Sequence, residues 1–309
     1  MLVSKPTPLG IEDFIKSATM FYIDPELEKE FNDAVEKEIR EIKTELLGTA
    51  TEEGLQKYIR ETPESLDRIT SVLNISEEKF KRIITMLRIR KGFTPTSEWS
   101  MDSLRVQMIE SSDWMSTVSR LLMYGKTLKE YQKLIPAFYL TNFAIDATTI
   151  GRLADDDDIR RLVKKGYEGK YNNKIGDSFF RKVSTYIIQK CNKEGLPYAI
   201  KEVVPLAEKQ ISITIPDTKH PRLMIDVTYG ITTSSTQTRL AKEAENISSK
   251  LRQKNQGKSD KEKTLYISIM DGAGWVARQS DLNKIHRCSD YLINLNSISL
   301  MDSIIEYYL

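Results

Sequence analysis

The chain has few of the residues that build zinc sites and disulfide frameworks. It contains two cysteines, Cys191 and Cys288, and two histidines, His220 and His286, in 309 residues. These side chains lack the short spacings of a Cys/His zinc site, and two cysteines imply no disulfide framework. No segment approaches about 18 uninterrupted apolar residues, and the N-terminal MLVSKPTPLGIEDF has no apolar signal core. We therefore expect a soluble, cytoplasmic protein without a membrane span.

A large excess of charge of one sign is also missing, because 46 Lys and Arg oppose 44 Asp and Glu for a net charge of +2. The distribution is less even than the total. Residues 166–309 hold 21 basic and 16 acidic residues, whereas residues 1–165 hold 25 and 28. Because contacts to phosphate need local basic surface, the second half of the chain is the half that favours a nucleic-acid partner.

The apolar pattern divides the chain into a helical first part and a mixed second part. Helical spacing dominates up to residue 150, and further helices are expected at 176–194 and 237–255. Short apolar runs typical of strands occur at about 198–204, 210–216, 222–229 and 264–270. The polar, glycine-rich GYEGKYNNKIG, which starts at Gly166, marks the boundary. We predict an all-helical domain over 1–165 and an α/β (α+β) domain with a mixed sheet over 166–309.

Three features of the helical part bear on function. The acidic run Asp155–Asp158 is interpreted as a helix N-terminus rather than a metal site, because acids there complement the helix dipole. A basic helix pair could contact DNA, although a packed helix with a solvated basic end is favoured; its cations are Lys81, Arg82, Arg88, Arg90 and Lys91. Most of four large apolar residues are expected in the core of this part, although their apolar surface could also form part of a subunit interface. They are Trp114, Leu121, Leu122 and Phe138.

The segment RLMIDVTYG places a carboxylate, Asp226, inside an apolar strand. With a period of two, one face of this strand holds Leu223, Ile225 and Val227, and the other holds Met224, Asp226 and Thr228. A carboxylate is costly to bury unless it is paired or binds a metal. Asp226 is therefore the first candidate for a catalytic or metal-binding residue.

Two turns are compatible with the hairpin that precedes Asp226. A turn over residues 220–223 would place Asp217 opposite Asp226, with Cα atoms roughly 4.5–5.5 Å apart. At this short distance the two carboxylates would repel each other unless a divalent cation bridged them. A turn over residues 215–218 would make Asp217 a turn residue and bring Asp226 opposite the region of Glu208 and Lys209. The first carboxylate ligand is thus Asp217 or, with the second turn, Glu208.

These residues resemble the PD…(D/E)xK motif of many type II restriction endonucleases. Pro216-Asp217 corresponds to its first half and Asp226-Val227-Thr228 to its second, with Thr228 where the family usually has lysine. Two further segments occur in the family's order. NNKIGDSFFRKVSTYIIQK, from Asn172, is similar to the helix that opens the nuclease core, and TLYISIM followed by the DGAGW turn from Asp271 resembles the end of several such enzymes.

The resemblance implies a restriction-endonuclease-like core in the order α-β-β-β-α-β, and Mg²⁺-dependent hydrolysis of double-stranded DNA at a short specific sequence in restriction–modification. It implies Asp217 and Asp226 as metal ligands and Thr228 at the position that activates the attacking water. Because threonine carries no positive charge, a second metal, solvent or Lys209 from the neighbouring strand would supply that role. The DGAGW turn itself is expected to be structural.

Candidate DNA contacts are polar side chains close to these motifs: Lys219, Arg222, Arg239, Arg278 and Gln279. A homodimer is expected, because cutting both strands of a two-fold symmetric site most simply uses two active sites related by the same axis. Two other classes stay open. One is a DNA-binding protein with the nuclease fold but no cleavage, favoured by the missing lysine. The other is a helical interaction protein, favoured by the near-neutral total charge.

Overall fold

The computed structural model describes residues 4–153 and 155–309, which form two compact units. The sheet unit combines the residues up to Leu27 with Lys170–Leu309, and the helical unit is Glu28–Gly169. The expected division after residue 165 therefore needs one correction, since the N-terminal residues pack in the sheet unit. The glycine-rich segment from Gly166 contains the boundary, as predicted, because the units divide between Gly169 and Lys170. The segment itself lies inside the long helix α11 (Asp156–Glu194).

Two helices contain residues of both units, because the divisions at residues 27/28 and 169/170 fall inside α2 (Pro25–Glu45) and α11. The other elements of the helical unit are η1 (Leu46–Gly48), α3 (Glu52–Glu61), α4 (Ser65–Val72), α5 (Glu77–Arg90), α6 (Met101–Glu110), α7 (Ser112–Tyr124), α8 (Lys129–Gln132), α9 (Ala137–Leu140) and α10 (Ala147–Arg152). Within the part of the chain that the structure describes, no helix has both the length and the apolar character needed to cross a membrane.

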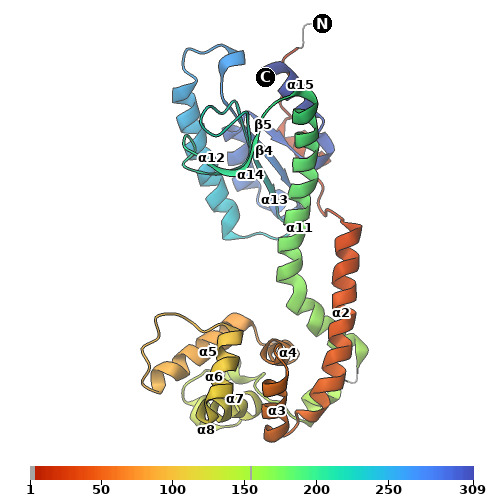
Figure 1. The fold of residues 1–309 in the computed structure, drawn as a ribbon, viewed down its shortest axis with the longest axis vertical. Coiled ribbons are helices and arrows are strands. Elements are labelled where there is room, and N and C mark those ends of the chain that lie inside the picture. The colour runs from red at the N-terminus through yellow and green to blue at the C-terminus, as the bar shows by residue number, and fades with distance from the viewer. Residues whose placement is uncertain (1–3, 154) are drawn as a thin grey trace. The chain divides into compact units, whose positions relative to one another are not determined.

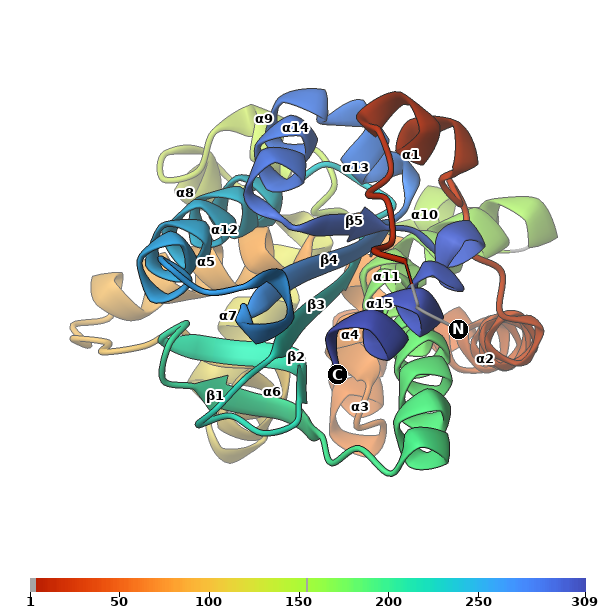
Figure 2. The ribbon, with the colours of Figure 1, turned by 90° about the horizontal axis from the view of Figure 1, so that it is seen from above.

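The sheet unit contains α1 (Ile11–Ser17), β1 (Ala199–Val204), β2 (Lys209–Ile215), β3 (Leu223–Tyr229), α12 (Ser235–Lys254), η2 (Asp260–Glu262), β4 (Leu265–Asp271), α13 (Ala273–Ala277), α14 (Gln279–Cys288), β5 (Tyr291–Ile293), η3 (Leu295–Ser297) and α15 (Leu300–Tyr308). Figure 1 labels β4 and β5, and Figure 2 shows that the strands lie in the order β1-β2-β3-β4-β5. The pairs β1–β2 and β2–β3 are antiparallel, and β3–β4 and β4–β5 are parallel. The predicted mixed α/β class is confirmed.

Helices cover both faces of this sheet (Figure 2), so its central strands are apolar on both sides. Leu223, Ile225 and Val227 of β3 pack with residues of α11 and α15. Met224, on the opposite face, packs with residues of α12 and α14. The predicted alternation along β3 is confirmed, and it places Asp226 on the face that α12 covers.

The DGAGW turn joins β4 to α13 and depends on close backbone packing. Gly272 has φ +108°, and a Cβ there would lie 2.3 Å from the carbonyl oxygen of Gly230. A Cβ at Gly274 would lie 2.4 Å from the carbonyl oxygen of Thr232. No side chain fits at either position, so these glycines hold the turn against the segment that follows β3. The turn has the structural character that the sequence predicted.

Asp271, at the end of β4, connects the N-terminal segment to the sheet. Its two carboxylate oxygens accept hydrogen bonds from the backbone amides of Thr19 and Leu295, both at 2.6 Å. Gly272 in turn donates its amide proton to the carbonyl of Thr19 at 3.1 Å. Burial raises the pKa of Asp271 to about 6, whereas the two amide donors act in the opposite direction. These bonds explain why the first residues belong to the sheet unit.

The helical unit has one continuous apolar core, and Trp114, Leu121 and Leu122 are buried in it. Phe138, expected to share that core, is 84% exposed instead.

The acidic run is the N-terminus of α11, as predicted. Asp155 accepts the amide protons of Asp157 and Asp158 at 2.9 and 3.1 Å.

The expected basic helix pair is largely engaged within the unit. Arg88 is buried, stacks 3.9 Å from the centroid of the Trp99 ring and donates to the carbonyl of Ser97. Lys91 pairs with Asp113 at 2.5 Å. These contacts agree with the favoured interpretation of a packed helix.

Candidate active site

Asp226 lies in the middle of β3 with only 9% of its surface exposed. Its Oδ2 accepts hydrogen bonds from Lys209 Nζ at 2.8 Å and from the Tyr266 hydroxyl at 2.9 Å. Its Oδ1 accepts a longer bond, 3.4 Å, from the backbone amide of Ser212. The buried carboxylate is therefore paired with a cation and with neutral donors, as its burial requires.

Lys209, the first residue of β2, links Asp226 to a second carboxylate. Its Nζ also donates to Glu243 Oε2 of α12 at 3.0 Å. Burial lowers the pKa of Lys209, but the two carboxylates outweigh burial and leave that pKa above its ordinary value. Burial raises the pKa of Glu243, and the bond and charge of Lys209 outweigh it, so this pKa is lowered. Both groups are consequently charged at neutral pH.

Two further side chains complete this group. Arg239 pairs with Glu243 one helical turn away, and its own side chain is 62% exposed. Tyr266 projects from β4, and its hydroxyl pKa is raised well above the ordinary value, first by burial and then by the charge of Asp226. We refer to Lys209, Asp226, Arg239, Glu243 and Tyr266 as the acid–lysine cluster. It carries two negative and two positive charges, and its Lys209 and Glu243 side chains are 20% and 26% exposed.

Asp217 does not lie in this cluster, so the expected pairing of Asp217 with Asp226 is wrong. The strands β2 and β3 pair with Ile213 opposite Ile225 and Ile215 opposite Leu223. Neither predicted turn has this register, because the connection occupies all of residues 216–222. Asp217 lies in that loop, with its Oδ1 accepting the amide protons of Lys219 and His220 at 2.8 and 2.7 Å. These backbone bonds lower the pKa of Asp217.

The other two predicted positions of the motif have separate environments. Glu208, the alternative first ligand, is exposed and pairs with Lys250 of α12 at 2.6 Å. Thr228 lies on the same face of β3 as Asp226, as predicted. Its Oγ1 is buried and finds no hydrogen-bond partner among residues 4–153 and 155–309.

Two of the five expected DNA contacts have hydrogen-bond partners within the protein. Arg222 donates to the backbone carbonyls of Lys261, Lys263 and Tyr308, so it ties the start of β3 to the C-terminal helix. Arg278 donates to the carbonyl of Ser234 and to Thr238 Oγ1 at 2.7 and 2.8 Å.

The other three keep exposed side chains. Lys219 and Gln279 are exposed, and Arg239 lies in the acid–lysine cluster.

Sequence reasoning missed Glu243 and Tyr266. The helix over 237–255 and the strand over 264–270 were expected, but nothing local indicates which of their side chains face β3. Glu243 had one weak signal, a basic residue four positions earlier on a predicted helix.

The cluster meets the minimal requirement for a Mg²⁺ ion. Mg²⁺ keeps several waters and is commonly held by one or two carboxylates together with substrate phosphates. Asp226 and Glu243 supply two carboxylates that share one ammonium partner. Across the described residues, three or more acidic, histidine or cysteine side chains do not gather with the geometry of a metal site. Two carboxylates beside one lysine have the chemistry that such a site requires.

Comparison with known protein families gives a match in the second half of the chain. Residues 160–308, just under half of the chain, match a family model of a restriction endonuclease domain. The model is described as the BanI C-terminal domain. The match supports a restriction endonuclease, and hence a nuclease that binds DNA. No curated protein matches the chain significantly.

Arg278 and its neighbour Gln279 make a matched pair for testing which residues serve the fold. Arg278→Ala removes the bonds to Ser234 and Thr238 and leaves the buried Asp281 without its cation, 3.0 Å away. We expect a loss of about 1–3 kcal/mol in the free energy of unfolding. Gln279→Ala should be silent, because the side chain is exposed. Urea unfolding of both variants measures the difference, and equal stabilities would contradict the structural role of Arg278.

Proposed function

We propose that the protein is a Mg²⁺-dependent type II restriction endonuclease of the PD-(D/E)XK kind, with the acid–lysine cluster as its active site. The observation that carries this proposal is the position of Lys209. The family's lysine is missing at Thr228, and an ammonium group reaches the strand carboxylate from β2 instead, at 2.8 Å. The family match over residues 160–308 supports the same class.

The sheet is the scaffold that this proposal requires. The elements α11, β1, β2, β3, α12 and β4 follow one another in the order α-β-β-β-α-β. Asp226 on the central β3, Lys209 on β2 and Glu243 on α12 then meet on one face. Because strands and a long helix carry these groups, their positions are held by regular hydrogen bonding rather than by loops.

Each group has a distinct part in hydrolysis. Asp226 and Glu243 would hold Mg²⁺, which polarises a scissile phosphate and lowers the pKa of an attacking water. Lys209 would supply a cation beside the phosphate, where a positive charge stabilises the charge that develops during hydrolysis. Arg239, exposed beside Glu243, can contact the adjacent DNA backbone. Tyr266 keeps Asp226 oriented from β4.

A DNA-binding protein with this fold but no cleavage is the second candidate. The observation that favours it is Thr228, which cannot supply a positive charge on β3. Incubation of long DNA with the protein in Mg²⁺ and in Ca²⁺ separates the two. Discrete fragments in Mg²⁺ support the nuclease, whereas retarded but intact DNA in both ions supports the binding protein.

The two aspartates of the hairpin give the sharpest test of the active site. Asp226→Asn removes a charge from the cluster and should lower cleavage by about 10²–10³-fold or more. Asp217→Asn is the matched control, because its carboxylate serves only the loop, and it should cleave normally. Initial rates on long DNA measure both. Loss of activity in the Asp217 variant with normal activity in the Asp226 variant would move the active site to the loop.

Lys209→Met tests whether the Lys209 ammonium group competes with a metal ion for the carboxylates of Asp226 and Glu243. The variant should lose cleavage, yet it should bind divalent ions more tightly without DNA, because two carboxylates then lack their shared cation. We expect about a tenfold gain in Ca²⁺ affinity, or about 1.4 kcal/mol, by titration calorimetry. Lys250→Met, which frees only the exposed Glu208, is the control and should leave Ca²⁺ affinity unchanged. An unchanged affinity in the Lys209 variant would place the metal elsewhere.

A homodimer is part of the proposal, because each chain offers one acid–lysine cluster and two strands must be cut. Light scattering of the complex with DNA in Ca²⁺ should give twice the 35.6 kDa chain mass in addition to the DNA. A single chain that only nicks one strand would contradict it.

A further inference from the structure

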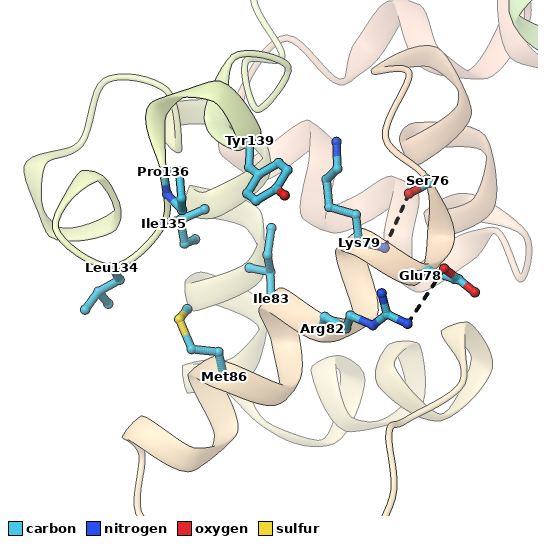
Figure 3. A pocket seen from close by; sticks show the side chains of 10 residues that line it. All are labelled: Ser76, Glu78, Lys79, Arg82, Ile83, Met86, Leu134, Ile135, Pro136 and Tyr139. Carbon is cyan, nitrogen blue, oxygen red and sulfur yellow. Dashed lines mark hydrogen bonds and ion pairs between the residues drawn. The ribbon is translucent and has the colours of Figure 1, made fainter.

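A cavity of about 390 Å³ opens in the helical unit, between α5 and the segment that carries α9 (Figure 3). Its base is apolar, with Ile83 and Met86 from α5 facing Leu134 and Ile135. Tyr139 forms one wall. The cavity lies wholly within the helical unit and uses no residue of the acid–lysine cluster.

The rim of this cavity exposes aromatic surface that the unit's own core does not cover. Tyr139 is 44% exposed and Phe138, beside it, is 84% exposed. Their ring centroids are 5.8 Å apart in an edge-to-face arrangement. Exposed aromatic rings in a hollow are suited to stacking against a flat partner.

Cations stand at the same rim. Lys79 Nζ lies 5.0 Å from the centroid of the Tyr139 ring, and no carboxylate of the described residues forms an ion pair with it. Arg82 lies 3.7 Å from Glu78 and 3.9 Å from Glu98, beyond direct hydrogen-bond distance, and its side chain is 69% exposed. Within the part of the chain that the structure describes, neither cation has a carboxylate within direct hydrogen-bond distance, so both can bind an incoming anion once a base takes the place of Lys79 over the Tyr139 ring. Together with Glu78 they give the lining a charge of +1.

From this combination we infer that the cavity binds an unstacked nucleotide of the DNA substrate, its base against Tyr139 and its phosphate between Lys79 and Arg82. Aromatic side chains bind bases by stacking on their faces, and basic groups bind the adjoining backbone. A base inside a duplex has both faces covered by its neighbours, so only a base outside the stack can reach the ring. The inference rests on the proposed function for its substrate, but not on the site of cleavage.

The test uses the full chain with ¹³C-labelled isoleucine and methionine methyl groups, in EDTA so that no cleavage occurs. The probe is a mixed-sequence single-stranded 8-mer deoxyoligonucleotide, compared with the blunt duplex of the same sequence. The methyl signals of Ile83, Met86 and Ile135, assigned by single substitutions, should shift with the single strand and much less with the duplex. Signals of Ile267 in the sheet core should stay in place.

Substitutions then identify the contacts. Tyr139→Ala combined with Lys79→Ala should weaken the single-strand affinity at least tenfold, whereas Tyr139→Phe should retain it. Tyr124→Ala combined with Arg90→Ala is the control, since Tyr124 is 40% exposed on the same unit, and it should bind as the unaltered protein does.

Three outcomes would overturn the inference. Methyl shifts of equal size for duplex and single strand would do so, and so would methyl shifts that persist in the Tyr139/Lys79 double variant. Methyl shifts that depend on protein concentration without DNA would indicate an interface between copies instead. Cleavage activity reports separately on the proposed function. A chain that cleaves DNA without these shifts overturns the cavity's role alone, and one that shows them without cleaving overturns the proposed function alone.

Discussion

The sheet unit depends on how one carboxylate is accommodated within an apolar strand. Asp226 is 9% exposed, and an unpaired charge at that depth would cost several kcal/mol. Lys209 and Tyr266 satisfy it from the two neighbouring strands, and Glu243 shares the same ammonium group from α12. One buried charge thus connects β2, β3, β4 and the helix that covers them, so the geometry of the cluster and the packing of this face have a common cause.

The strand positions and the faces of β3 were predictable, because both follow from local periodicity. In a sheet covered on both sides, the apolar runs of the sequence end where the strands end. Along β3, the residues of one face (Leu223, Ile225 and Val227) alternate with those of the other (Met224 and Asp226), as a strand requires. The register of the hairpin was not predictable in this way. Both expected turns used four residues around a proline, whereas the connection runs over residues 216–222, and Asp217 stabilises it through backbone amides.

Lys209 was expected beside Asp226 from the neighbouring strand, whereas Glu243 and Tyr266 were missed for a related reason. Lys209 lies 17 residues before Asp226, Glu243 lies 34 residues after Lys209, and Tyr266 lies 40 residues after Asp226. Their meeting depends on which side of each element faces β3, and that is decided by tertiary packing. The basic side chains show the same limit. Arg222 and Arg278 donate to backbone carbonyls, and Arg278 also pairs with Asp281, whereas Arg239 pairs with a carboxylate of the cluster.

The position of Lys209 changes the significance of Thr228. A lysine two residues after the strand carboxylate projects from the same face of the same strand, so its ammonium reaches the space beside that carboxylate. In this chain an ammonium reaches the carboxylate from β2, across the antiparallel pair, while Thr228 leaves its hydroxyl buried. What hydrolysis needs is a positive charge at that point in space, because the charge that develops on phosphate is stabilised by position and not by sequence order. Under the proposed function, the motif defined along the chain loses its lysine while the site retains the charge.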